Sequence, residues 1–200
     1  PGSAVWRGSG GRDRREAFGF RDGISDPVIA GTGRDLTPGN GVWVPDDPDD
    51  PAGPGSWRPV RTGEVVLGHR DESGEVAGHP DAAPLEADGS YLVLRKLRQD
   101  VDGFHTACRT WAEELGGEWT QEAVEAQLVG RWHDGRPLGG SPDPRDNDFR
   151  YGGPDGLGDT IPRSSHIRRS NPRDDPVVPS SMVRRHLLFR RGMPYDDGAH

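Results

Sequence analysis

The chain has 200 residues, a formal net charge of −8 and only 30% hydrophobic residues, together with 30 glycines and 19 prolines. This composition predicts a loop-rich globular protein whose core needs a bound cofactor or a further lobe to be complete. The acidic balance argues against nucleic acid as a partner, the single cysteine excludes an internal disulfide, and no apolar run approaches the roughly 18 residues that a membrane span needs.

The first part of the chain is dominated by loops. Residues 1–17 are rich in glycine and arginine, and we expect them to be a flexible remnant of a linker or of an N-terminal lobe. Residues 18–29, FGFRDGISDPVI, form a compact motif in which two glycines surround an arginine and an aspartate. The stretch 30–62 is rich in Gly, Pro and Asp, with 42–44 as its only apolar anchor, whereas 64–68 is expected to be a short buried strand.

The middle of the chain carries the most regular patterns. Residues 90–97, SYLVLRKL, alternate in the way of a strand, with two leucines on one face. Residues 104–115 have apolar side chains at helical spacing, and a pair of glycines follows them. Thr120 is then expected to cap a second helix that ends at Gly130.

The last part of the chain returns to loops before two further elements. The basic segment 166–172 is expected to be short because its proline ends it, and 182–190, MVRRHLLFR, is predicted to be a strand. Together these elements indicate an α+β fold with roughly half of the residues in loops. The sequence opens at Pro1 without a methionine and stops after a strand-like segment, so we expect both ends to be incomplete.

The turn from Gly19 to Gly23 suits proton-transfer chemistry. Its two glycines let the backbone approach a ligand closely, and Asp22 lies between them. The flanking Phe18 and Phe20 are expected to shield the carboxylate partly from water, as suits a group that transfers protons. An ordinary Asp-Gly turn is the alternative.

Two basic segments suit redox chemistry. His166 offers an imidazole, the usual ligand of haem iron, and Arg168 and Arg169 beside it could pair with haem propionates. Arg190 ends an apolar segment and could stabilise developing negative charge in a cavity, with Arg191 as the alternative if the register differs by one. Taken alone, these segments are also explained by a solvated basic turn and a solvated strand end.

In their order along the chain, these segments resemble the dye-decolourising haem peroxidases. FGFRDGIS matches the Gly-x-x-Asp-Gly signature in the form common to fungal and actinobacterial members. Five further segments follow in the order of that family, namely SYLVLRKLRQDVDGF, QLVGRWHDGRPL, NDFRY, SHIRRSNPR and LLFRRGMPY. The resemblance covers nearly the whole chain.

The resemblance implies ferredoxin-like α+β lobes of the dimeric α+β barrel type, incomplete here at both ends, with haem b between the lobes. It implies that His166 is the iron ligand and that Arg168 helps to bind the haem. Asp22 and Arg190 would be the catalytic residues opposite His166, and they would also contact the haem. Residues 18–200 would then be the haem-binding peroxidase region, a truncated C-terminal lobe.

The function that the resemblance implies is a bacterial, haem-dependent peroxidase. It would reduce hydrogen peroxide and oxidise dyes or phenolic substrates by one-electron steps, with small-molecule reductants as partners and a homo-oligomer as the full-length form. The compartment stays open between the cytoplasm and export through a signal upstream of Pro1. A surface aromatic residue is expected to relay electrons from bulky dyes, and the candidates are Trp111, Trp119, Trp132, Tyr151 and Tyr195.

Two other functions are alternatives. A non-catalytic haem-binding remnant, or inactive fragment, would keep the motifs without turnover. A hydrolase or metalloenzyme would use the many Asp and His residues. The sequence lacks a Gly-x-Ser-x-Gly nucleophile elbow, and the acidic loop at 143–148 lacks the glycine and glutamate of a calcium loop, which disfavours the second alternative.

Overall fold

The computed structural model describes residues 15–46, 49, 53–76, 88–153, 155–190 and 192. The chain divides into two compact units. The first unit takes in Pro1–Ile24, Leu97–Asp146 and Arg190–His200, and the second unit takes in Ser25–Lys96 and Asn147–Phe189. Each unit is therefore built from segments that lie far apart in the sequence.

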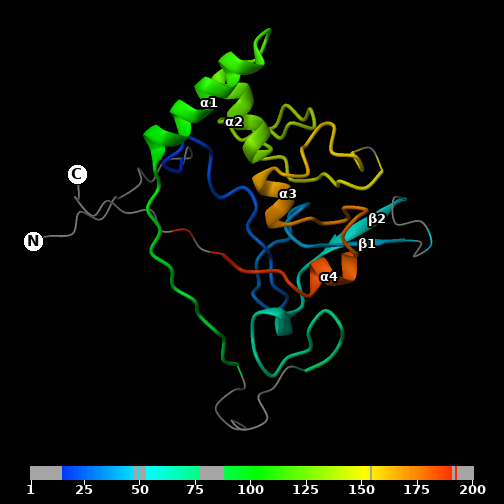
Figure 1. Ribbon diagram of the computed structural model, residues 1–200. Coiled ribbons are helices and arrows are strands. Elements are labelled where there is room, and N and C mark those ends of the chain that lie inside the picture. Colours follow the sequence, from blue (N-terminus) through cyan, green and yellow to red (C-terminus); the bar gives the residue numbers. More distant parts are fainter. Residues whose placement is uncertain are drawn as a thin grey trace, which may run out of the picture. The chain divides into compact units, whose positions relative to one another are not determined.

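Two helices, α1 (Val101–Leu115) and α2 (Gln121–Val129), lie side by side in the first unit (Figure 1). The side chain of Asp100 accepts a hydrogen bond from the backbone N–H three residues on, and Thr120 does the same for α2. Gly130 ends α2 with a left-handed φ of 93°, as a C-terminal glycine commonly does. Both predicted helices are confirmed, including the cap and the stop of the second.

The core of the first unit lies between these helices. Cys108 and Ala112 of α1 pack against Val124 of α2, and Phe104 covers the edge of this group. Phe104, Cys108 and Ala112 recur along α1 at the helical spacing seen in the sequence, because one face of each helix must be buried against the other.

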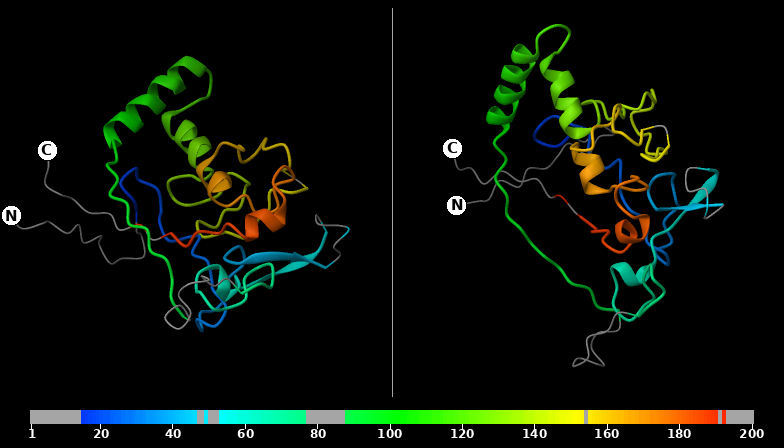
Figure 2. Two further views of the ribbon diagram at one scale, coloured as in Figure 1. Left: turned by 60° about the horizontal axis from the view of Figure 1, so that its bottom comes forward. Right: turned by 45° about the vertical axis from the view of Figure 1, so that its right-hand side comes forward.

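The second unit contains a small antiparallel sheet of β1 (Val42–Pro45) and β2 (Gly55–Arg58) (Figure 2). Trp43 lies opposite Trp57 in the register, and their rings meet edge to face with centroids 5.3 Å apart. The Pro- and Gly-rich run at residues 45–55 connects the two strands in the sequence.

Short helices complete the second unit. They are the 3₁₀ helix η1 (Thr62–Glu64), α3 (His166–Ser170) and α4 (Ser180–Arg184). The apolar core of this unit is made by Ile29, Val42 and Val60, with Val65 and Leu187 packed against them.

Three predicted strands are wrong. The segment 64–68 begins in η1 and continues as a turn, and the segment 182–190 begins inside α4 and then runs extended without forming a strand. Residues 90–97 run extended and exposed (green in Figures 1 and 2), and within the described chain they enter no sheet. Alternating apolar residues favour an extended backbone, but a strand also needs a neighbour to accept its hydrogen bonds.

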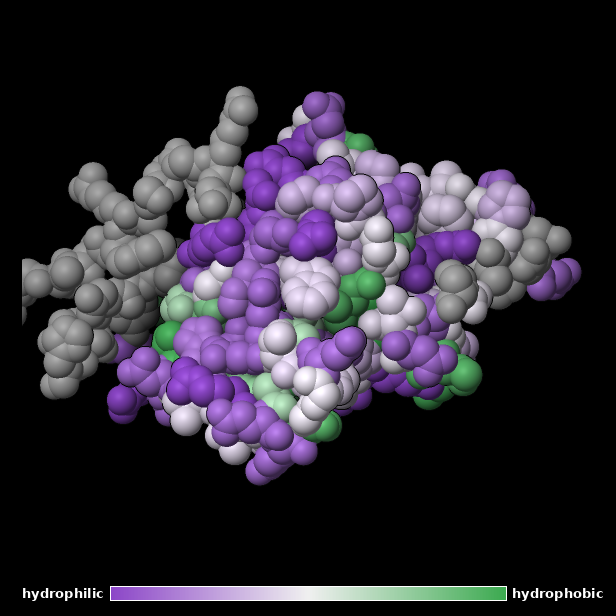
Figure 3. Space-filling model, turned by 90° about the horizontal axis from the view of Figure 1, so that it is seen from above, coloured by the Kyte–Doolittle hydropathy of each residue, from purple (hydrophilic) through white to green (hydrophobic). Residues whose placement is uncertain are grey.

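Hydrophilic side chains cover most of the face drawn in Figure 3, and apolar side chains appear there only in small patches. Among the helices that the structure describes, none has both the length and the apolar character needed to cross a membrane.

Candidate functional site

Asp22 lies in a tight loop of the first unit. Gly19 and Gly23 on either side have φ values of 95° and 73°, in the left-handed region that favours glycine. The Oδ1 atom of Asp22 accepts a hydrogen bond from the N–H of Gly23 at 2.7 Å. The two glycines expected to shape this turn therefore do so.

The aromatic residues beside the loop do not shield Asp22. Phe18 packs on Phe104, with ring centroids 4.7 Å apart, and the buried Phe20 meets the ring of His133 at 4.5 Å. Both phenyl rings contribute to the interior of the first unit, and Asp22 is exposed. The expected shielding is therefore not found.

The Asp22 loop is docked on the backbone of His133. The N–H of Arg21 donates to the His133 carbonyl oxygen at 3.0 Å. The guanidinium of Arg15 donates to the same oxygen at 2.9 Å and to the carbonyl oxygen of Gly19 at 2.8 Å. The carbonyl oxygen of His133 thus binds the loop directly through Arg21 and indirectly through Arg15.

The side chain of His133 lies next to a buried carboxylate, that of Glu125 of α2, which is 1% exposed. Its Oε1 atom is 2.7 Å from Nδ1 of His105 and 2.8 Å from Nε2 of Gln121, and its Oε2 atom is 2.7 Å from Nε2 of His133. Burial by itself raises the pKa of Glu125, but the hydrogen bonds from His105 and Gln121 and the charges of the two histidines outweigh it. The pKa therefore lies below its ordinary value.

We call Glu125, His105, His133 and Gln121 the Glu125 cluster. Sequence reasoning missed this cluster, because its members lie on α1, on α2 and in the loop after α2, and no local spacing links them. Within the part of the chain that the structure describes, no three His, Cys, Asp or Glu residues are arranged to hold a metal ion.

Arg168 is the central charged residue of the second unit and is only 2% exposed. Its Nε atom donates to Asp175 at 2.7 Å, and one terminal nitrogen donates to Asp155 at 3.1 Å and to the Ile161 carbonyl at 2.9 Å. The guanidinium also lies 4.6 Å from the centre of the Tyr151 ring. Its partners are thus protein groups of the same unit.

Asp175 is held ionised by these contacts. Burial alone raises the pKa of Asp175, but the bond from the N–H of Val177 and the bond and charge of Arg168 outweigh burial, with Arg163 adding a further positive charge. The pKa of Asp175 therefore lies below its ordinary value. The result is a fixed ionic centre beneath helix α3.

His166 is the first residue of α3 and is exposed. Two residues further along α3, Arg168 forms ion pairs with Asp155 and Asp175. These ion pairs fix the helix that bears the imidazole. In its donor chemistry this arrangement fits a haem iron, which takes an imidazole nitrogen as its protein ligand. The exposed imidazole of His166 could therefore hold such an iron.

Arg190 follows an extended segment in which Leu188 and Phe189 are exposed, and it is itself exposed. Arg191, the alternative, lies outside the described residues. Of the residues singled out in the sequence, His166 and Arg168 lie together on α3 in the second unit, whereas Asp22 and Arg190 belong to the first unit.

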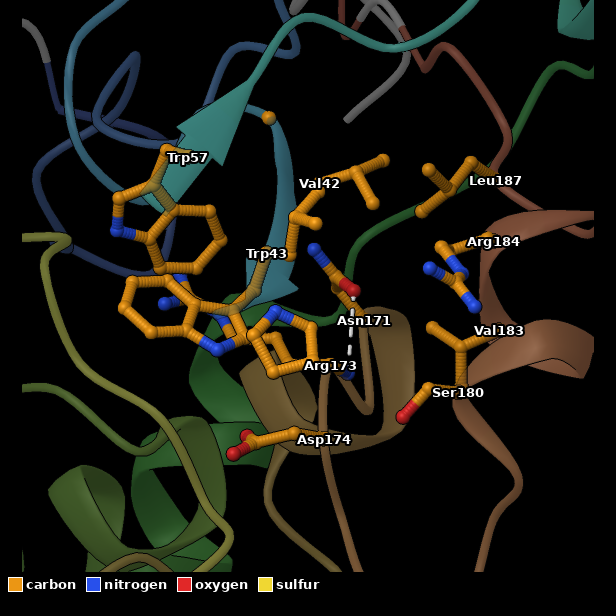
Figure 4. A pocket seen from close by; sticks show the side chains of 13 residues that line it. Val42, Trp43, Trp57, Asn171, Arg173, Asp174, Ser180, Val183, Arg184 and Leu187 are labelled. Atoms are coloured by element: carbon orange, nitrogen blue, oxygen red, sulfur yellow. Dashed lines mark hydrogen bonds between the residues drawn. The ribbon is translucent and has the colours of Figure 1, made fainter. Parts of the chain in front are cut away.

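A pocket of about 400 Å³ is present in the second unit. In Figure 4, Trp43 and Trp57 line one side of it, and Val183 and Leu187 of the chain around α4 lie opposite. Asp174 also lines the pocket, and its Oδ2 atom is buried without a hydrogen-bond partner among the described residues. The mixture of aromatic walls and a few polar groups is typical of a small-molecule pocket, but His166 does not line it.

Comparisons with known proteins agree with the sequence resemblance. No family model matches the chain. The multifunctional dye peroxidase DyP2 of Amycolatopsis sp. is 36% identical over 198 residues, which cover 92% of this chain and 37% of that protein. A dye-decolorizing peroxidase of Mycena epipterygia is 32% identical, covering 93% of this chain and 35% of that protein.

Solved structures give the same answer. An ancestral D-type dye decolorizing peroxidase matches with a TM-score of 0.67 and 31% identity, over 94% of this chain and 40% of that one. A fungal DyP-type peroxidase from Auricularia auricula-judae matches with a TM-score of 0.58 and 27% identity, over 86% of this chain and 36% of that one. The chain thus spans little more than a third of the length of the proteins it matches, and within that span it is similar to dye-decolorizing peroxidases and shares their ferredoxin-like α+β fold.

Proposed function

We propose that this chain forms part of a haem-dependent peroxidase that reduces hydrogen peroxide and oxidises dyes or phenolic compounds in one-electron steps. The observation that carries the proposal is its similarity to curated dye peroxidases over 92% of the chain. Dyes are proposed from the names of these relatives, and phenols from a related structure in complex with 2,6-dimethoxyphenol. Hydrogen peroxide and a small-molecule reductant would be the partners.

His166 would hold the iron of haem b through an imidazole nitrogen. A bound haem would supply the redox chemistry, namely the reduction of peroxide and the one-electron oxidation of the reductant. The role of this chain's residues is to fix the imidazole. Arg168 contributes indirectly in this proposal, since it anchors α3 through Asp155 and Asp175 rather than pairing with a propionate.

Asp22 and Arg190 would act on the peroxide. The Asp22 carboxylate takes the proton from one peroxide oxygen and returns it to the other, so that water can leave. The Arg190 guanidinium stabilises the negative charge that develops as the O–O bond breaks. The exposed Asp22 carboxylate is accessible for such a proton transfer.

Bulky reductants need an oxidisable residue that they can reach. Trp111 and Trp119 are 45% and 44% exposed, whereas Tyr151 is enclosed beneath Arg168. Trp132 is half-buried, and Tyr195 lies outside the described residues. We therefore favour Trp111 and Trp119 as the surface contacts of a dye.

Further features of the whole protein are proposed on the same basis. Residues 18–200 would be the haem-binding region and 1–17 would precede it. The full-length protein would be a homo-oligomer and would not bind nucleic acid. The matched relatives come from both bacteria and fungi, so a bacterial source stays a prediction.

A second candidate is haem binding without turnover. It would need the iron ligand but not the groups that act on peroxide. Peroxide turnover needs Asp22 and Arg190 as well as the iron ligand, whereas binding needs chiefly His166. The two candidates therefore differ in their response to substitution of Asp22.

Hemin titration tests both candidates. We expect the wild-type chain to give a Soret band typical of histidine-ligated haem, and His166→Ala to lose it. His69→Ala, which removes an exposed histidine of the same unit, is the matched control and should bind hemin normally. An equal loss of the band in both variants would contradict the assignment of His166.

Peroxide-dependent bleaching of an anthraquinone dye then separates enzyme from binder. We expect Asp22→Asn to retain the Soret band and to lower the rate of bleaching by about 10²–10⁴-fold, the usual contribution of a general acid–base. If the wild-type chain binds hemin and bleaches no dye, binding without turnover is the function of this chain.

A further inference from the structure

We propose that Glu125 is a positioning residue for Asp22, acting through His133. The proposal deepens the proposed function and rests on it, because Asp22 is the expected acid–base. The juxtaposition that supports it lies wholly within the first unit, where the Glu125 cluster and the Asp22 loop meet at His133.

A buried carboxylate at this place is costly and needs compensation. Removing the charge of Glu125 from water is unfavourable unless its oxygens are paired. Here Oε1 is paired with His105 and Gln121, and Oε2 with His133, so the carboxylate bridges α1 to the loop after α2. An apolar residue would fill the same space but would not fix the ring of His133 in one orientation.

His133 contacts both Glu125 and the Asp22 loop. Its Nε2 atom lies 2.7 Å from the carboxylate of Glu125, and its ring meets the ring of Phe20 edge to face at an interplanar angle of 86°. Its carbonyl oxygen accepts the N–H of Arg21, the residue directly before Asp22. Side chain and backbone of one residue therefore connect the buried carboxylate to the proposed acid–base.

The contact between Glu125 and His133 depends on charge. Nε2 of His133 lies 2.7 Å from the carboxylate but outside hydrogen-bond geometry, so the attraction is mainly electrostatic. The other ionisable neighbours are Cys108 on α1, Arg109, which reaches Gln121 at 3.3 Å, and Arg15, which binds the His133 carbonyl. Ionised Glu125 is thus the state that holds His133 in place.

Amide hydrogen exchange on the haem-free chain tests the proposal without any need for activity. We expect Glu125→Gln to raise the exchange rate of the Arg21 amide about tenfold, while amides in the middle of α1 and α2 keep their protection. Glu122→Gln, at an exposed position of the same helix, is the matched control and should leave Arg21 unchanged.

The pH dependence of Arg21 exchange distinguishes the proposed electrostatic role of Glu125 from a simple loss of packing. Because the pKa of Glu125 lies below its ordinary value of about 4.3, protection of Arg21 should persist through that pH and be lost only as the pH falls further. In Glu125→Gln the acid-dependent step should be absent. A wild-type chain whose Arg21 protection does not change between pH 5 and the acid limit of folding, on the order of pH 2, would contradict the proposal.

A second variant covers the case in which Glu125→Gln also disturbs the helices. His133→Phe keeps an aromatic ring against Phe20 and removes the contact with the carboxylate. It should increase Arg21 exchange as Glu125→Gln does, and unchanged exchange in a folded His133→Phe chain would overturn the proposal.

Hemin-loaded chains distinguish this proposal from the proposed function. Glu125→Gln should bind hemin as wild type does and should alter the pH profile of dye bleaching. If the wild-type chain bleaches no dye, the proposed function fails, while the exchange of Arg21 still decides whether Glu125 positions the loop.

Discussion

Arg168 is a buried charged residue whose ion pairs join several segments of the second unit. Its guanidinium joins Asp155 and Asp175 to the backbone of Ile161, and it lies over Tyr151. An arginine can bridge two carboxylates in this way because its planar group presents several donors at fixed angles. The same contacts fix α3 and with it the proposed iron ligand.

Replacement of Arg168 should therefore destabilise the second unit strongly. Arg168→Met removes the cation that pairs with the buried Asp155 and leaves Asp175 with Arg163 alone. We expect a loss of about 3–5 kcal/mol in the free energy of unfolding. Urea unfolding followed by tryptophan fluorescence measures it, since Trp43 and Trp57 lie in this unit. Arg169→Met, at an exposed position of α3, is the control, and a comparable loss in that variant would contradict the role given to Arg168.

Among the elements, helix α2 depends on local signals at both ends. The side chain of Thr120 accepts the N–H of Ala123 at 3.1 Å, and Gly130 ends the helix. Thr120→Ala leaves this N–H without its partner, so we expect a loss of about 1 kcal/mol in the stability of the first unit. Chemical unfolding monitored by circular dichroism measures the change.

Thr110→Ala provides the comparison for the cap. Thr110 is exposed in α1 and bonds back to the carbonyl of Thr106, an interaction that gives a helix little stability. This variant should be neutral or slightly stabilising, and a loss equal to that of Thr120→Ala would argue against a capping role.

The contrast between helices and strands explains which elements the sequence predicts. The two long helices follow from short-range signals, such as Thr120 and Gly130, that lie in the segment itself. The strands predicted at 90–97 and 182–190 need partners that a local pattern does not specify, and the structure shows neither as a strand. The turn around Asp22 can likewise be predicted, because its two glycines lie within the same five residues. The contact of Glu125 with His133 cannot, because no local pattern links a residue of α2 to the loop after it.

At the scale of the whole molecule, the low hydrophobic content coexists with a long exposed apolar segment. In 90–97, Leu92 is 90% exposed and Leu94 is 79% exposed, although both repeat on one face of the extended chain. Extended backbone with exposed apolar side chains favours pairing with another chain. Among the residues that the structure describes, this segment is thus the part best suited to association.

We accordingly expect the isolated chain to self-associate as its concentration rises, and Leu92→Lys with Leu94→Lys to reduce this association. Two added positive charges repel each other across copies and remove the apolar face, so the effect should exceed that of a single charge elsewhere. Sedimentation velocity over a range of concentrations measures the mass. Leu157→Lys, at an exposed leucine outside the segment, is the control. If it lowers association as much as the double variant does, the driving force is general surface hydrophobicity rather than the extended segment.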